Sequence, residues 1–199
     1  MLAFSARFSN WESQEGQDGE DKEGFKLTGM KHSPLYFLEL ASRFFEEAIH
    51  ECGDEAPQLC ILQAMILLAH GQLTQGVRGK AWRSLGTCVR LAYELNLHLV
   101  DAGHARPVAD ARERCDFEEK RRAWWAIWEM DIFASTVRRC PTAMDWSQNE
   151  TLLPIEDEYW FQNKPRASCF LEKDLVRRWK VLQESGNHWP KRGILWSTL

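Results

Sequence analysis

The spacing of apolar residues along the chain predicts a series of helices. Pro34 suits the first turn of a helix, and apolar residues then recur at steps of three and four as far as Gly53. A second helix is predicted to begin at Pro57 and to end at Gly71, because residues 59–68 are apolar almost throughout. A helix that is apolar on all sides has to be buried between other helices.

Three more helices are predicted further along the chain. They cover residues 81–96, 109–137 and, as a shorter element, 171–183. Pro141 and Pro154 bracket an irregular stretch between the last two. Because no run alternates with a period of two over a useful length, no sheet is predicted. The predicted class is all-α, with antiparallel helical hairpins packed around one core.

The first 33 residues have a different composition. Between Glu12 and Glu23 stand six acidic residues and one lysine, which predicts a disordered acidic insertion. An acidic activation segment would interleave large hydrophobic residues with its acids, whereas Trp11 and Phe25 only flank this one. The predicted division is an irregular segment at 1–33, a helical domain at 34–185 and a short tail at 186–199.

Charge and hydropathy argue against two classes of protein, freestanding nucleic-acid binders and membrane proteins. The formal net charge is −4 at pH 7, so the chain lacks the basic excess of a freestanding nucleic-acid binder. The N-terminus has no apolar stretch of signal-peptide length, and the run Leu59–Ala69 is too short to cross a bilayer. We expect a soluble intracellular protein with no membrane contact.

The six cysteines do not form a local metal site. They stand at positions 52, 60, 88, 115, 140 and 169, and no C-x-x-C pair occurs. Zinc fingers and zinc clusters need closely spaced thiolates to complete a tetrahedron. The interpretation is therefore that the cysteines fill core positions on helices.

Other candidate chemistry is sparse. Glu47 and His50 have the E-x-x-H spacing of di-iron bundles, but no second such motif accompanies them. His98, Asp101 and His104 lie in one loop without a fourth ligand nearby. G-x-S-x-G, H-E-x-x-H, P-loop and G-x-G-x-x-G motifs are absent. We predict no catalytic residue and no metal site. A small helical enzyme that uses these histidines remains a distant alternative.

The fourth predicted helix contains three tryptophans. Trp124 and Trp128 stand four residues apart and share a face, while Trp125 lies about 100° around the helix. Two interpretations stay open. The tryptophans form core, or they form an aromatic wall around a small ligand.

Charged residues in the same helix could either contact such a ligand or stabilise the helical core. Arg121, Arg122 or Asp131 could supply polar contacts to such a ligand. The triplet that begins at Lys120 has the composition of a nuclear import signal, but acidic residues precede it and tryptophans follow. We therefore interpret the triplet as structural.

Four stretches of the chain resemble a known family. The first stretch is Gly79-Lys-Ala-Trp82 with Val89-Arg90-Leu-Ala92, and the second is Tyr93–His98. The third is Glu119-Lys-Arg-Arg-Ala-Trp-Trp125 with Asp131. The fourth is Pro141 with Leu153-Pro154 and Asp157-Glu158. In this order they resemble the fungal-specific transcription factor domain. This is the middle homology or regulatory domain of zinc-cluster transcription factors, typified by xylanolytic activators. The resemblance covers residues 1–11 and 35–185, and the Arg-Arg-x-Trp-Trp helix is its most specific part.

The sequence also departs from the family pattern. Arg139 stands where a glycine is common, and Asn96 replaces the usual glycine after the third helix. The six-cysteine zinc cluster and its linker are absent from the 199 residues, and the chain stops at Leu199, short of the family's later helices.

The resemblance implies a nuclear regulator of transcription by RNA polymerase II. It implies DNA and zinc binding only through the missing cluster, and no cofactor in this chain. Implied partners are a small-molecule effector, a dimerisation partner or the transcription machinery. The alternative is a truncated helical protein that acts through full-length partners. The candidate effector-pocket or core residues are Trp82, Arg90, Arg121, Arg122, Trp124, Trp125, Trp128 and Asp131.

Overall fold

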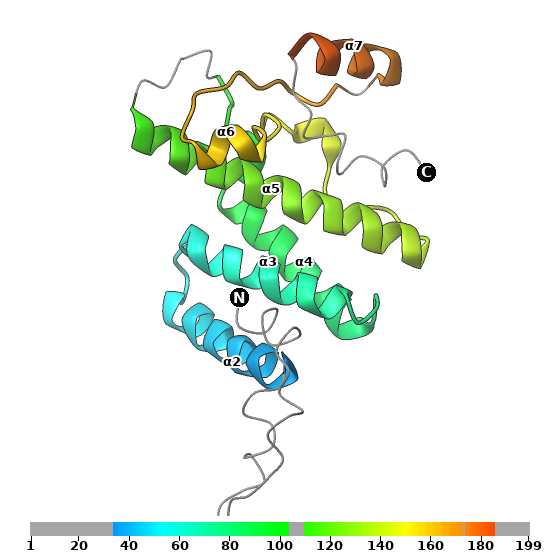
Figure 1. Ribbon diagram of the computed structural model, residues 1–199. Helices are drawn as coiled ribbons and strands as arrows, with labels where there is room; N and C mark the ends of the chain where they lie inside the picture. Colours follow the sequence, from blue (N-terminus) through cyan, green and yellow to red (C-terminus); the bar gives the residue numbers. More distant parts are fainter. Residues whose placement is uncertain (1–33, 104–109, 173, 186–199) are drawn as a thin grey trace, which may run out of the picture. The chain divides into compact units, whose positions relative to one another are not determined.

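The computed structural model describes residues 34–103, 110–172 and 174–185. All of its regular elements are helical, and no strand occurs in these ranges (Figure 1). The predicted all-α class is therefore confirmed. The predicted acidic insertion lies outside the described residues, and so does the predicted tail.

The chain divides into two compact units, residues 1–55 and 56–199. The first contains helix α2, Pro34–Cys52, which begins at the predicted proline. The second contains the elements α3 (Leu59–Leu73), α4 (Gly79–Glu94), η3 (Leu97–Leu99), α5 (Ala111–Arg138), η4 (Trp146–Gln148), α6 (Asp157–Phe161) and α7 (Leu175–Ser185). The short elements η3, η4 and α6 were not predicted.

Helices α3, α4 and α5 pack together and supply most of the buried side chains of the second unit (Figure 1). Leu62 of α3, Leu85 of α4 and Ile127 of α5 are among the fully buried residues. The apolar stretch of α3 is buried only in part, because Leu62, Met65 and Leu68 are buried whereas Leu67 is 39% exposed and Ala64 is exposed. The prediction that this helix is buried on all sides was therefore wrong.

The second helix lies two residues further along the chain than predicted, and Gly71 is not its terminator. Helix α3 continues through Gly71, which is buried, and ends at Leu73. Thr74 then caps the helix, with its hydroxyl donating to the Gly71 carbonyl at 2.8 Å. In the turn that follows α3, Gly76 has a positive φ of +112°.

The ends of α4 and α5 use left-handed residues that are not glycine. Asn96 follows α4 with φ of 53°, and Arg139 caps α5 with φ of 55°. Asparagine adopts this conformation more readily than most residues, whereas arginine has no such advantage. At the other end of α5, the Asp110 carboxylate accepts a hydrogen bond from the Glu113 N–H at 3.1 Å.

No helix among the described residues has both the length and the apolar character that crossing a bilayer requires.

Candidate functional site

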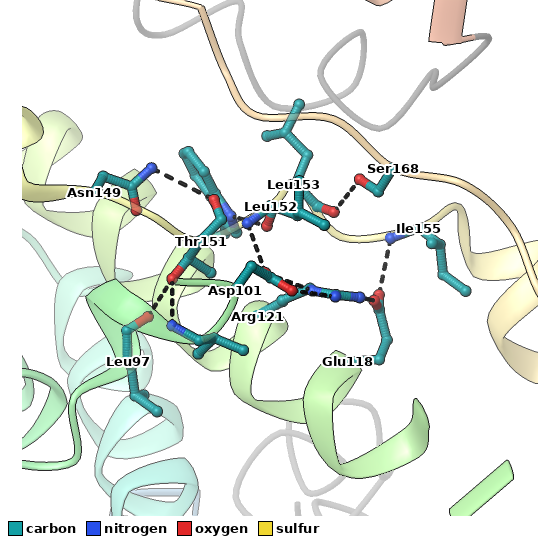
Figure 2. A network of polar contacts seen from close by, with 12 residues as sticks. Leu97, Asp101, Glu118, Arg121, Asn149, Thr151, Leu152, Leu153, Ile155 and Ser168 are labelled. Atoms are coloured by element: carbon teal, nitrogen blue, oxygen red, sulfur yellow. Dashed lines mark hydrogen bonds and ion pairs between the residues drawn. The ribbon is translucent and has the colours of Figure 1, made fainter. Parts of the chain in front are cut away.

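Two buried carboxylates and an arginine form the centre of a polar network beside α5 (Figure 2). Asp101 follows η3, and Glu118 lies in the first half of α5. Arg121 donates from Nε to Asp101 Oδ2 at 2.9 Å and also from Nη2 to Asp101 Oδ1. Its Nη1 lies 3.5 Å from Glu118 Oε2. Because Asp101 and Glu118 are 6% and 2% exposed, this arginine compensates negative charge that is removed from water.

The same carboxylates hold the segment that leads to α6. Asp101 Oδ2 accepts a hydrogen bond from the Leu152 N–H at 2.8 Å, and Glu118 Oε1 accepts one from the Ile155 N–H at 2.9 Å (Figure 2). Arg122 donates to Glu118 Oε1 at 3.0 Å, to the Ile155 carbonyl at 2.8 Å and to Asp157 Oδ1 at 2.7 Å. The network therefore fastens an irregular segment to α5.

A buried threonine attaches this segment to η3 and to the residue that follows it. Thr151 Oγ1 donates to the Leu97 carbonyl at 2.6 Å and accepts from the Val100 N–H at 3.2 Å. The Glu150 N–H also donates to the His98 carbonyl at 2.7 Å. Both α5 and the turn after α4 thus hold residues 150–155 in place.

The electrostatics of the network follow from its burial. Burial raises the pKa of Glu118, although the charges of Arg122 and Arg121 and the Ile155 N–H favour its ionised form. For Arg121, burial alone would lower the pKa, but the hydrogen bonds and charges of Asp101 and Glu118 outweigh it and raise the pKa. The structural interpretation of the basic triplet agrees with these roles of Arg121 and Arg122.

The three tryptophans of α5 are buried, but they group differently from the prediction. Trp125 and Trp128, three residues apart, pack edge to face with ring centroids 5.1 Å apart. Trp146 of η4 joins them at 5.9 and 5.2 Å. Trp124 instead meets Tyr93, with a centroid separation of 5.6 Å. Residues three apart on a helix are neighbours as much as residues four apart, so the pairing follows the surrounding chain.

One tryptophan also joins the polar network. The Trp125 indole N–H donates to the Leu152 carbonyl at 2.7 Å. A fully buried indole thus contributes packing at one edge and a hydrogen bond at the other. Trp146, which completes the cluster, was missed because no periodic pattern marks the irregular stretch that contains it.

Asp131 performs a similar task further along α5. Its Oδ2 accepts hydrogen bonds from the Ala143 N–H at 2.7 Å and the Met144 N–H at 3.0 Å, and Oδ1 accepts one from the Ser135 hydroxyl at 3.4 Å. Burial raises the pKa of Asp131, while these three donors act in the opposite direction. The carboxylate therefore fastens the turn after α5 to the helix.

The remaining candidate residues lie apart from these networks. Trp82 of α4 is half-buried, and the Arg138 guanidinium lies 4.9 Å from its ring centroid. Arg90 is exposed on α4. The structure thus brings Arg121, Arg122 and Trp125 together and leaves Trp82 and Arg90 elsewhere.

A cavity of about 450 Å³ lies against the first half of α5. Its walls come from α5, from residues 152 and 155, from α6 and from residues 163–168. Arg121 and Glu118 line it, and its aromatic residues are Phe117, Tyr159 and Trp160. The tryptophans of α5 are not among its lining residues.

The cysteines and the metal candidates were also located. Cys88 is buried on α4, whereas Cys60 is exposed, so the expectation that the cysteines fill the core was wrong for Cys60. Within the described ranges, no group of three or more His, Cys, Asp or Glu side chains is placed to hold a metal ion. Asp101 pairs with Arg121, and His104 lies outside the described residues.

The fold and the site define an all-α domain organised around one long helix that is rich in tryptophan and ion pairs. The sequence model of the family described as the fungal specific transcription factor domain matches residues 1–188. The chain belongs to this family. The family and the relatives that match are transcription regulators.

Curated relatives agree with this family. The chain is 29% identical over 115 residues to the citrinin biosynthesis transcriptional activator mrl3 of Monascus ruber, a match that covers 58% of the chain and 22% of the relative. It is 32% identical over 104 residues to the tropolone cluster transcription factor tropK of Talaromyces stipitatus, covering 52% of the chain and 18% of the relative.

A third relative is the Zn(2)-C6 fungal-type transcription factor FTF1c of Fusarium oxysporum. It is 26% identical over 121 residues, which cover 59% of the chain and 13% of that protein. The chain therefore spans about a fifth or less of the length of these relatives. No solved structure matches the chain.

Proposed function

We infer that this chain is the regulatory part of a fungal zinc-cluster transcription factor that acts in the nucleus on transcription by RNA polymerase II. The observation that carries the inference is the family match over residues 1–188. Relatives named as transcriptional activators support it, and one of them is named as a Zn(2)-C6 protein. The role is regulation by binding, without catalysis.

In this proposal, DNA and zinc are bound by a cluster that the 199 residues do not contain. Their cysteines are too widely spaced to form it, and the helical chain needs no cofactor of its own. A helical core in which buried hydrogen bonds and ion pairs link α5 to the segment after it suits a domain that transmits a signal to other parts of a regulator.

A tethering experiment tests the regulatory role. The chain is fused to a heterologous DNA-binding domain and expressed in a filamentous fungus with a matching reporter gene. We expect reporter expression to change severalfold relative to the DNA-binding domain alone. A fusion with Trp125→Ala, which removes a fully buried side chain, serves as the control and should lose the effect. An unchanged reporter with the folded fusion in the nucleus would contradict the proposal.

A second candidate function is association with full-length family members. Exposed apolar side chains favour it, since Phe161 is 80%, Val176 81% and Trp179 62% exposed. Sedimentation of the purified chain mixed with a full-length family member, over a range of concentrations, tests this function. A Trp179→Ser variant should weaken association, and a chain that sediments apart from the full-length protein at all concentrations would speak against it.

A further inference from the structure

The exposed side of α4 carries a row of three cations, which we call the basic face. Lys80, Arg83 and Arg90 are exposed, and their spacing of three and seven residues places them along one side of the helix. The row is about 15 Å long, given the rise of an α-helix per residue. Among the described residues, none of the three forms an ion pair, and neither does Glu94 at the end of the helix. The positive charge of the basic face is therefore available to a partner.

Further arginines lie around the beginning of α4. Arg78 precedes the helix, and the Arg138 guanidinium of α5 lies 4.9 Å from the ring centroid of Trp82. The stretches that contain all of these cations, residues 74–93 and 132–144, include no acidic residue. In a chain with a formal net charge of −4, this part of the second unit thus has the opposite sign.

The middle of the basic face has no side chain. Gly86 is exposed, and a Cβ at this position would meet nothing within 4 Å. Packing inside the protein therefore does not require a glycine here, although glycine is unfavourable in the interior of a helix. The bare backbone between Arg83 and Arg90 allows an extended segment of a partner to approach closely.

The chain itself contains a segment of complementary charge. Residues 12–23 include six acidic residues and one lysine. When extended, twelve residues reach up to about 40 Å, which exceeds the length of the basic face. Carboxylates accept charge-assisted hydrogen bonds from Lys and Arg, and Arg can donate two parallel ones. Every copy of the chain therefore carries both halves of an ionic contact.

We propose that the basic face of one copy binds residues 12–23 of a second copy. The carboxylates of the acidic segment pair with Lys80, Arg83 and Arg90. Two copies that exchange their segments reciprocally form a closed dimer with two such contacts. A nucleic acid fits less well, because proteins that bind one through a basic face carry an overall basic excess, whereas this chain is acidic.

Sedimentation velocity of the purified full chain tests the proposal. We expect dimers to accumulate with protein concentration at low salt. Association should weaken as NaCl rises from about 50 to about 500 mM, because salt screens exposed charges. The variant Trp179→Ser should leave this salt dependence unchanged, which separates the ionic contact from the apolar association of α6 and α7.

Two variants with opposite effects on the net charge locate the contact. The first neutralises the basic face through Lys80→Gln, Arg83→Gln and Arg90→Gln. The second neutralises half of the acidic residues of the segment through Glu15→Gln, Glu20→Gln and Asp21→Asn. Each should raise the dissociation constant of the dimer about tenfold, because several exposed ion pairs are lost together. A general effect of net charge would act in opposite directions in the two variants.

A matched control removes the same charge from other helices. It combines Arg112→Gln, Lys120→Gln and Arg177→Gln, all at exposed positions, and should associate as the natural protein does.

Four results would overturn the proposal. They are a chain that stays monomeric at low salt, association that does not respond to salt, a loss in only one of the two neutralised variants, and an equal loss in the control. A labelled DNA duplex that binds the chain and is released by the basic-face variant would assign the face to phosphate instead. The assay uses purified protein and no reporter gene, so its failure is separate from a failure of the regulatory function.

Discussion

At the scale of single residues, Arg121 is the side chain on which the buried network depends. It is the direct cationic partner of Asp101, whose side chain is 4% exposed. We predict that Arg121→Ala lowers the free energy of unfolding by about 3 kcal/mol, because it leaves a buried carboxylate without its cation. Lys120→Ala removes the same charge from the neighbouring exposed position and should cost about 0.5 kcal/mol or less. Urea unfolding measures both, and equal losses would contradict the assigned role.

The raised pKa of Asp131 predicts how the free energy of unfolding depends on pH. Burial raises the pKa of its carboxyl above the ordinary value of 3.8, so the folded state keeps this proton to a higher pH than the unfolded state does. As pH rises above 3.8, the unfolded state loses the proton first, and this group's contribution to stability falls. The difference in unfolding free energy between the natural protein and Asp131→Asn should therefore shrink as pH rises through this range.

Urea unfolding at several acidic pH values measures that difference. Asp116→Asn, at an exposed position of the same helix, controls for the loss of an acidic side chain. A difference that grows with pH would show that the three hydrogen bonds of Asp131 outweigh its burial.

At the scale of elements, α5 ends in a residue with a strained backbone, and a substitution can relieve that strain. Arg139 is exposed and left-handed, a conformation that costs a residue with a Cβ about 1–2 kcal/mol. We predict that Arg139→Gly raises the free energy of unfolding by about 0.5–1 kcal/mol, since part of the relief is offset by the greater freedom of glycine in the unfolded chain. Arg138→Gly is the contrasting variant. It should destabilise by about 1 kcal/mol, because Arg138 is helical and stacks on Trp82. Thermal and urea unfolding of both variants check the opposite signs.

The long helices could be predicted because apolar periodicity is a local signal. α2, α4 and α5 begin and end within about two residues of their predicted bounds. Gly71 was misread as a terminator because a buried glycine inside a helix looks the same in sequence as one that ends it. The elements η3, η4 and α6 were missed because three to five residues are too few to show a period.

At the scale of the whole molecule, sequence identified the central helix but not its partners. The pattern singled out Arg121, Arg122 and Trp125, yet their contacts with Asp101, Asp157 and Leu152 join residues 20 to 35 positions apart. Such contacts depend on how the chain returns to α5, and no local spacing encodes that path. The cavity could not be predicted from the sequence for the same reason, because its lining residues come from four segments that only the fold brings together.

At the same scale, the net charge of the chain predicts that its 199 residues alone do not bind the DNA backbone. A protein that binds the phosphate backbone releases counterions, so its affinity falls steeply as salt concentration rises. This chain carries a formal net charge of −4, and Arg121 and Arg122 are engaged in internal ion pairs. The 199 residues alone should therefore show no salt-sensitive binding to a labelled duplex by fluorescence anisotropy. An isolated zinc-cluster domain measured in parallel should show it. A tight complex of the chain that weakens with salt would mean that a DNA-binding surface lies within these residues, and the assignment of DNA contacts to a separate cluster would fail.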